Sequence, residues 1–361
     1  CTGYYDYDQG YAPTWPGMDL FGGQVVHPQH WPEGLDYAGQ RVVVIGSGAT
    51  AVTLVPAMAE TAAHVTMLQR SPSYVAAQPS EDALADRLRR RLPGRLAHGI
   101  TRWKNVLRSM LFYQIARRRP AQFKAVMLKG TQRQLGQDYD VGTHFTPSYD
   151  PWDQRLCMAP DGDLFAAIRS GHASVVTDHI ETFTETGVQL RSGAHLEADL
   201  VVTATGLTLR LMSGLDLVVD GRPVDLAQTT AYKGAMYSDV PNLASALGYT
   251  NASWTLKCDL TAEYVCRLLN HMARRGYAQV TPRQRDSEAA GEPILDFSSG
   301  YVQRALDRLP QQGAARPWRL RQNYALDLLD LRYSALDDGV LEFEPAPKHL
   351  GPPPLSRRTP I

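Results

Sequence analysis

The sequence predicts an α/β fold that contains a parallel β-sheet, and three segments carry this prediction. Residues 41–45 (RVVVI) are almost continuously apolar and end at a glycine, as parallel strands buried on both faces do. Residues 49–60 have helical composition and lead to a second apolar run at 65–68. Residues 200–206 (LVVTATG) form a third run of the same kind. The order strand, glycine-rich turn, helix, strand is a βαβ crossover, which belongs to a parallel sheet.

Glycine and proline positions, together with the periodicity of apolar residues, predict the remaining elements of the chain. Residues 1–34 are rich in glycine, proline and aromatic residues and are expected to be irregular. A helical insertion is expected at about 80–145, with breaks at Pro93-Gly94 and Pro120. The remaining expected elements are a helix at 164–168, a strand at 173–177, a hairpin turn at 191–193, an amphipathic helix at 256–275, a polar linker at 281–293 and a Pro-rich, disordered tail at 345–361.

Composition excludes several classes of protein. The chain has 361 residues, which is enough for two cores, and 43% of them are hydrophobic, as in globular proteins. The formal net charge is zero, so no nucleic-acid partner is expected. No run of about 18 apolar residues predicts a membrane span. The four cysteines have no CxxC spacing, which favours a reducing, cytoplasmic location.

A glycine-rich turn follows the first predicted strand. Gly46, Ser47, Gly48, Ala49, Thr50 and Ala51 match the GxGxx(G/A) fingerprint of dinucleotide-binding folds. Gly46 allows the tight turn, Gly48 allows the backbone to approach a pyrophosphate, and Ala51 permits close packing of the helix. The amides at the N-terminus of the helix can bind the phosphates. The turn therefore predicts a dinucleotide site, against the alternative of an ordinary glycine-rich turn.

The end of the second strand indicates which dinucleotide binds. An NAD site usually has Asp or Glu about 20 residues after the glycines. This sequence instead has Arg70 and Ser71, and a guanidinium can pair with a 2′-phosphate through two hydrogen bonds. NADPH is therefore preferred over NADH, although Arg70 could also be a solvated residue at a strand end.

The helical region 87–133 contains fourteen basic residues and no acidic residue. It is expected to be the solvated face of an inserted helical subdomain. Because Trp103, Leu107, Met110, Leu111 and Phe112 lie among these charges, the alternative is a patch that makes peripheral contact with a membrane surface.

A motif just before the glycine-rich turn resembles a family fingerprint. Its residues follow the pattern F-x-G-x-x-x-H-x-x-x-W-P and are Phe21, Gly23, His27, Trp31 and Pro32. This pattern resembles that of the flavin-dependent Baeyer–Villiger monooxygenases, the class B flavoprotein monooxygenases. The resemblance extends over nearly the whole chain. It includes a strong similarity to members that oxygenate thioamides, which is carried by residues 44–53, 68–72, 151–157 and 248–257.

The resemblance implies two Rossmann-like domains, with an NADPH domain inserted into an FAD domain. It predicts residues 1–34 as the end of the first FAD-domain segment and the linker, 35–207 as the NADPH domain and 208–344 as the C-terminal part of the FAD domain. Thr205 and Gly206 resemble the point where the chain returns to the FAD domain. The FAD fingerprint is expected upstream of residue 1, so that the FAD domain is truncated and this fragment could fail to bind FAD.

The same resemblance assigns roles to individual residues. Arg155 matches the arginine that stabilises a flavin C4a-peroxide and the anionic adduct, because a guanidinium keeps its proton. Gln154 stands where many members have lysine, which removes one possible phosphate contact. His27 has two readings, a structural hydrogen bond or a hinge between domains, and a zinc site with His30 is not expected.

The segment before the amphipathic helix offers a possible flavin contact. Asn251 and Ser253 are candidate N-caps of that helix. In related flavoproteins the N-terminus of a helix faces the flavin and stabilises negative charge on the reduced ring. The sequence is equally consistent with a flavin contact and with simple helix capping at these two residues.

These observations together predict an FAD- and NADPH-dependent monooxygenase. The expected reaction uses O₂ to convert ketones to esters, or to oxygenate the sulfur of thioethers and thioamides, through a C4a-peroxyflavin. One alternative is an N-hydroxylating or flavin-containing monooxygenase, whose fingerprint differs at the positions of His27 and Trp31. The other is a truncated relative that binds NADPH without activity.

Overall fold

The computed structural model describes residues 2–285 and 291–346, and these residues form two compact units. Of the described residues, unit 1 contains 2–105, 111–213 and 297–304. Unit 2 contains 106–110, 214–285, 291–296 and 305–346. The predicted tail lies largely outside the described residues. The predicted assignment of these parts to FAD and NADPH domains stays a prediction.

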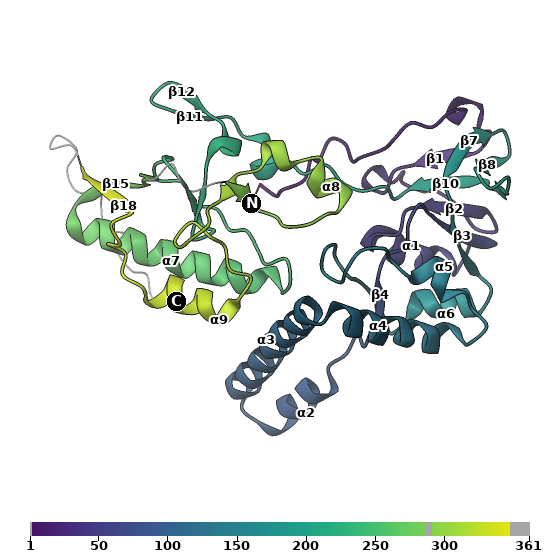
Figure 1. The fold of residues 1–361 in the computed structure, drawn as a ribbon, viewed down its shortest axis with the longest axis horizontal. Coiled ribbons are helices and arrows are strands. Elements are labelled where there is room, and N and C mark those ends of the chain that lie inside the picture. Colours follow the sequence, from purple (N-terminus) through teal and green to yellow (C-terminus); the bar gives the residue numbers. More distant parts are fainter. Residues whose placement is uncertain (1, 286–290, 347–361) are drawn as a thin grey trace. The chain divides into compact units, whose positions relative to one another are not determined.

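The centre of unit 1 is a five-stranded parallel sheet, which confirms the α/β fold class (Figure 1). Its strand order is β1-β10-β2-β3-β6. The strands are β1 (Gln24–Val26), β10 (Leu200–Thr203), β2 (Arg41–Ile45), β3 (His64–Gln69) and β6 (Ala173–Thr177). The last four of these strands were predicted from their apolar runs.

Residues 1–34 were predicted to be irregular, and the strand β1 shows that this prediction was wrong for Gln24–Val26. β1 pairs in parallel with β10, from Gln24 opposite Leu200 to Val26 opposite Val202. Only Val26 of its three residues is buried, so the segment has no periodicity that predicts a strand. The pairing also needs Gly23, because a Cβ at that position would lie 2.2 Å from the carbonyl oxygen of Asp199.

Two helices pack against the parallel sheet. The helix α1 (Ala49–Met58) follows β2 and buries Ala51, Val52, Val55 and Met58. The helix α6 (Asp163–Arg169) precedes β6 and buries Leu164, Phe165 and Ile168. A separate antiparallel sheet consists of β7 (Ile180–Thr184), β8 (Gly187–Leu190) and β9 (His195–Glu197). Its hairpin turn at 191–193 was predicted.

The helical insertion has the breaks that its prolines predict. Its helices are α2 (Ala83–Arg91), α3 (Gly94–Arg118), α4 (Pro120–Leu135) and α5 (Val141–Phe145). The flanking strands β4 (Val75–Gln78) and β5 (Cys157–Pro160) pair in parallel outside the main sheet. Along α3, exposed apolar residues follow one another at intervals of three or four, namely Leu96, Ile100, Trp103, Leu107 and Leu111.

The exposed apolar row on α3 does not make it a membrane span. Within the described residues, no helix combines the length and apolar character needed to cross a bilayer. Peripheral contact of residues 87–133 with a membrane stays a prediction.

Unit 2 is built around the predicted amphipathic helix, α7 (Trp254–Arg275). The apolar residues at helical spacing, Leu256, Leu260, Tyr264, Leu268 and Met272, are all buried, as expected. They pack with residues of α9 (Tyr324–Leu328), β15 (Tyr277–Pro282) and β18 (Leu341–Pro345). Shorter paired strands complete the unit: β11 (Leu217–Val219), β12 (Arg222–Val224), β13 (Ala231–Tyr232), β14 (Met236–Tyr237), β16 (Glu292–Pro293) and β17 (Gln311–Gln312).

Candidate functional site

The carboxyl ends of the parallel strands in unit 1 lie at one edge of the sheet, where α/β proteins bind their ligands. The residues that follow β1, β2, β3 and β10 are those that the sequence analysis singled out. They include His27 after β1, Gly46 after β2, Arg70 after β3 and Thr205 after β10. The structure therefore brings most of the predicted site residues to a single edge.

The glycine-rich turn has the close approach that its fingerprint requires. Gly46 has φ +141°, and a Cβ there would lie 2.3 Å from the carbonyl oxygen of Ala204 in the neighbouring strand connection. Gly48 is the N-cap of α1, without a side-chain cap, and the space beside it holds no protein atom within 4 Å of a built Cβ. Ala51 is fully buried against the sheet. The turn thus offers a backbone cradle with amide groups, as a pyrophosphate site needs.

The end of β3 is tied to the glycine-rich turn by hydroxyl groups. Ser47 Oγ donates to the carbonyl oxygen of Ser71 at 3.1 Å and shares a hydrogen bond with Ser73 Oγ at 2.9 Å. Gln69 is buried, and its amide donates to the carbonyl oxygen of His144 and to Thr177 Oγ1. Arg70 is exposed. Ser71 is exposed as well, so Arg70 and Ser71 are the side chains of this strand end that are available to a ligand.

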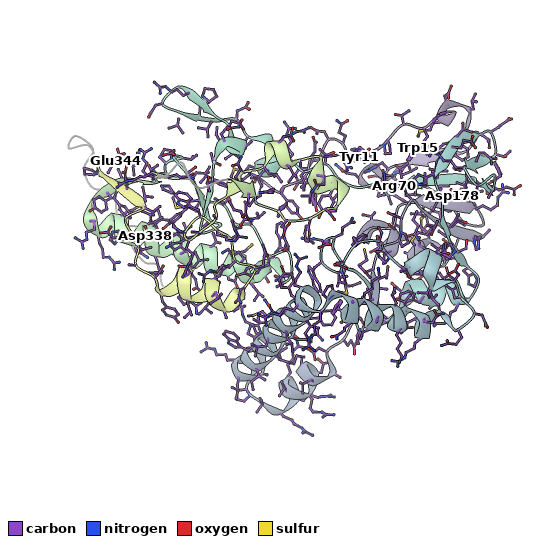
Figure 2. The ribbon with its side chains drawn as sticks, viewed as in Figure 1. Tyr11, Trp15, Arg70, Asp178, Asp338 and Glu344 are labelled. Atoms are coloured by element: carbon purple, nitrogen blue, oxygen red, sulfur yellow. The ribbon has the colours of Figure 1, made fainter. Side chains whose placement is uncertain are left out.

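A second group gathers where β10 ends. The Tyr11 amide donates to the carbonyl oxygen of Gly206 at 3.0 Å, and Thr205 Oγ1 donates to the carbonyl oxygen of Tyr11 at 2.5 Å. The Arg304 guanidinium carbon lies 3.5 Å from the centroid of the Tyr11 ring. Figure 2 labels Tyr11 and Arg70 in this part of unit 1. No local sequence pattern points to Tyr11 or Arg304, because their place depends on tertiary contacts.

His27 has a structural role at this edge. Its Nδ1 accepts the amide of Gln29 at 3.2 Å and so caps a short 3₁₀ helix, Pro28–His30. Burial lowers its pKa, while the backbone of Gly206 has the opposite, smaller effect. His27 is thus neutral near pH 7, and its Nε2 lies buried on the side of Gly10 and Gly206. This geometry favours the structural reading, and the hinge reading stays a prediction.

The other fingerprint residues pack around β1. Phe21 is buried and meets the Phe183 ring edge-on, with 5.9 Å between ring centroids. Trp31 is partly exposed and contacts Tyr37 edge-on at 6.2 Å. Phe21 therefore anchors the segment just before β1 in the buried cluster that includes Val43 and Val201.

Arg155 lies in a loop of unit 1 that is anchored from two sides. The Asp153 carboxylate forms an ion pair with Arg117 of α3 at 2.7 Å. The backbone carbonyl oxygen of Asp153 accepts a hydrogen bond from the amide of Ser298 at 2.8 Å. Arg155 is exposed, and its charge acts on Tyr5, whose pKa is raised mainly by burial and lowered in part by Arg155. Tyr301 acts on the same Tyr5. The Arg155 charge therefore lies within electrostatic reach of the buried Tyr5.

Asn251 and Ser253 belong to unit 2. Ser253 is the N-cap of α7, as predicted, but its hydroxyl pairs with Thr255 Oγ1 at 2.8 Å and makes no side-chain cap. The Asn251 amide donates to the carbonyl oxygen of Gln322 at 2.9 Å. Side-chain capping by either residue was therefore a wrong expectation. The first amides of this 22-residue helix have no side-chain cap.

Known proteins of similar sequence are monooxygenases. The profile described as "FMO-like: Flavin-binding monooxygenase-like" matches residues 1–219. The chain is 52% identical over 344 residues to the FAD-containing monooxygenase EthA of Mycolicibacterium smegmatis, covering 95% of this chain and 70% of that protein. It is 51% identical to the probable FAD-binding monooxygenase AlmA of Acinetobacter baylyi, over 95% of this chain and 69% of that protein.

Solved structures of similar fold are more distant in sequence. An oxidized steroid monooxygenase bound to NADP matches with a TM-score of 0.68 at 19% identity, over 93% of this chain and 73% of that one. OTEMO in complex with FAD and NADP matches with a TM-score of 0.61 at 20% identity, over 79% of this chain and 62% of that one. The fold is therefore shared with these enzymes, and this chain spans about six- to seven-tenths of the length of its relatives. Together with the sequence matches, this places the chain in the flavin-binding monooxygenase-like family, which includes the Baeyer–Villiger monooxygenases.

Proposed function

We propose that this chain takes part in an NADPH- and O₂-dependent oxygenation. The substrate is a ketone that becomes an ester, or an organosulfur compound such as a thioether or thioamide. The observation that carries this proposal is the family membership over 95% of the chain, joined to the fingerprint from Phe21 to Pro32. FAD, when bound, supplies the carrier of the reactive oxygen.

The residues at the sheet edge fit the dinucleotide NADPH. The open space beside Gly48 and the uncapped N-terminus of α1 suit the pyrophosphate. Arg70 and Ser71 suit the 2′-phosphate, since Arg70 is exposed and the strand end is held by Ser47. For FAD, unit 1 offers Thr205 and Gly206 as candidate contacts after β10. In unit 2, taken by itself, the N-terminus of α7 after Ser253 has no side-chain cap and suits a negatively charged group.

Replacing Arg70 tests the cofactor preference. In Arg70→Gln the affinity for NADP⁺ is expected to fall about tenfold or more, because one charge-assisted contact with the 2′-phosphate is lost. The affinity for NAD⁺ should stay nearly constant. Calorimetric titration of the purified chain with each nucleotide measures both values. Arg222→Gln, an exposed arginine on β12 of unit 2, is the control and should change neither. Equal weakening of both nucleotides would contradict the assignment.

Arg155 supplies a fixed positive charge in this proposal. Such a group stabilises the negative charge that develops on the carbonyl oxygen of the substrate. The Arg117–Asp153 ion pair and Ser298 hold the backbone two residues before Arg155, so the start of its loop is in place before the substrate arrives.

Arg155→Gln is expected to lower kcat about a hundredfold, the effect of removing one preorganised donor from a developing negative charge. The dissociation constant of NADP⁺ should hardly change. Steady-state assay of the protein with a methyl ketone, next to nucleotide titration, measures the two effects. Arg191→Gln, in the exposed turn between β8 and β9, serves as the control.

The products of the same assay test the reaction type. An ester from the methyl ketone, or a sulfoxide from a thioether, supports the proposal. A hydroxylamine from a primary amine without any ester would favour an N-hydroxylating enzyme instead. A colourless protein that releases no flavin on heating would favour a relative that binds NADPH without activity.

A further inference from the structure

One segment of the C-terminal half of the chain belongs structurally to unit 1. Residues Phe297–Arg304 group with unit 1, although the residues on both sides of them group with unit 2. The Ser298 amide and hydroxyl both donate to the carbonyl oxygen of Asp153, at 2.8 and 3.1 Å. Val302, within the short helix α8 (Gly300–Gln303), is fully buried. The segment is therefore anchored, and it ends with Arg304 at a defined place.

Arg304 lies over the end of β10. Its guanidinium stacks on the ring of Tyr11, and a Cβ built on Gly206 would lie 3.7 Å from its Nη2. Tyr11 is itself held by hydrogen bonds with Thr205 and Gly206. A guanidinium stacked on an aromatic ring keeps the N–H groups along its edge available for an anion.

Arg70 follows β3 and Gly206 follows β10, and these two strands flank β2 in the parallel sheet, so both residues lie at its carboxyl edge. Burial lowers the pKa of the Arg304 guanidinium, Tyr11 opposes this effect, and the charge of Arg70 lowers the pKa further. In the described part of the chain, neither arginine forms a hydrogen bond or ion pair with a carboxylate. Two neighbouring guanidinium groups without a counter-ion repel each other, and an anion between them removes this cost.

The position of Arg70 indicates which anion binds. Arg70 directly follows β3, where dinucleotide-binding folds place the ribose of the adenosine half. The carboxylate of Asp178, after the adjacent strand β6, accepts the amides of His179 and Ser192 at 2.6 and 3.2 Å. That carboxylate is thus engaged in its own turn and does not mark a ribose hydroxyl.

We propose that Arg304 is a second specificity-determining residue of the nucleotide site, and that it binds the 2′-phosphate of NADPH together with Arg70. The inference rests on the proposed NADPH function and deepens it. The recognition of the phosphate then involves two parts of the chain that lie far apart in sequence. The Tyr11 ring positions the second guanidinium.

Calorimetric titration of the full 361-residue chain tests this assignment. In Arg304→Gln the dissociation constants of NADP⁺ and of 2′,5′-ADP are expected to rise about tenfold, as for one charge-assisted hydrogen bond. Those of NAD⁺ and 5′-ADP should change less than about twofold, because these ligands lack the 2′-phosphate. Arg308→Gln, whose arginine lies four residues further on and pairs only weakly with Asp307 at 3.9 Å, is the matched control and should bind like the parent chain.

Two further variants sharpen the test. Arg304→Lys keeps the charge but loses the planar stack, so it should bind NADP⁺ with an intermediate affinity. Tyr11→Leu should weaken NADP⁺ in the same direction, since it leaves Arg304 without its platform. Thermal unfolding without ligand verifies that each variant is folded.

The outcomes separate this inference from the proposed function. If Arg304→Gln binds NADP⁺ as tightly as the parent, or weakens NADP⁺ and NAD⁺ equally, the inference is overturned. If Arg70→Gln alone loses NADP⁺, the NADPH site stands and Arg304 has no part in it. If the parent chain binds neither nucleotide, both the proposed site and the inference fail.

Discussion

Lys257→Met is expected to lower the free energy of unfolding of unit 2 by about 3–5 kcal/mol, because it leaves a buried carboxylate without its cation. Lys257 Nζ lies 2.7 Å from Asp327 Oδ2, and the two side chains are only 6% and 7% exposed. The same oxygen accepts the Tyr249 hydroxyl at 2.8 Å, and Lys257 also donates to the carbonyl oxygen of Lys233. Burial and the charge of Asp327 raise the pKa of Tyr249, so this hydroxyl stays protonated and cannot replace the lysine.

Urea unfolding monitored by circular dichroism measures this effect. The double variant Lys257→Met, Asp327→Leu should recover most of the lost stability, since two apolar residues of similar size need no partner. Arg332→Met is the control, because the pair of Arg332 with Glu263 is 38% and 42% exposed and should contribute less than about 1 kcal/mol. A double variant as unstable as Lys257→Met alone would show that packing, and not the uncompensated charge, causes the loss.

The two glycines of the nucleotide turn should respond to alanine in different ways. Gly46→Ala is expected to lower the free energy of unfolding by about 3 kcal/mol and to abolish NADP⁺ binding, because the new Cβ would lie 2.3 Å from the Ala204 oxygen at φ +141°. Gly48→Ala should change stability by less than about 0.5 kcal/mol, since no protein atom lies within 4 Å of its Cβ and its φ is −81°.

Nucleotide affinity distinguishes a ligand cradle from a simple turn. Gly48→Ala should still weaken NADP⁺ and NAD⁺ about tenfold or more, because the methyl group occupies the space through which a pyrophosphate approaches the backbone. Urea unfolding and calorimetric titration of the same two variants measure both properties. Unchanged nucleotide affinity in Gly48→Ala would mean that the pyrophosphate does not lie over this turn.

Local sequence patterns predicted much of the parallel sheet and of its glycine-rich edge. The apolar runs ending at Ile45 and Thr203 mark strands that are buried on both faces, and such strands carry their signal in a few consecutive residues. Pro120 begins a helix at the break that it predicted. These features depend on near neighbours in the chain, so the sequence alone was sufficient for them.

Features that depend on distant partners were missed. The strand β1 has a single buried residue, Val26, and it is defined by its pairing with β10 rather than by its own pattern. Arg304 is one arginine among many, and nothing around it in the sequence indicates that it stacks on Tyr11. The side-chain cap expected of Ser253 was wrong because Thr255 offers its hydroxyl a nearer partner.

Because Phe297–Arg304 belongs to unit 1, although it is distant from the rest of that unit in sequence, the fold has a practical consequence for protein engineering. A protein cut after Ser213 would keep the five-stranded sheet and the glycine-rich turn, but it would lose the support that Ser298 gives to Asp153. It would also lack the Arg304 guanidinium that stacks on the ring of Tyr11. An autonomous version of unit 1 therefore needs this octapeptide grafted back through a linker, as a circularly permuted or spliced polypeptide would allow.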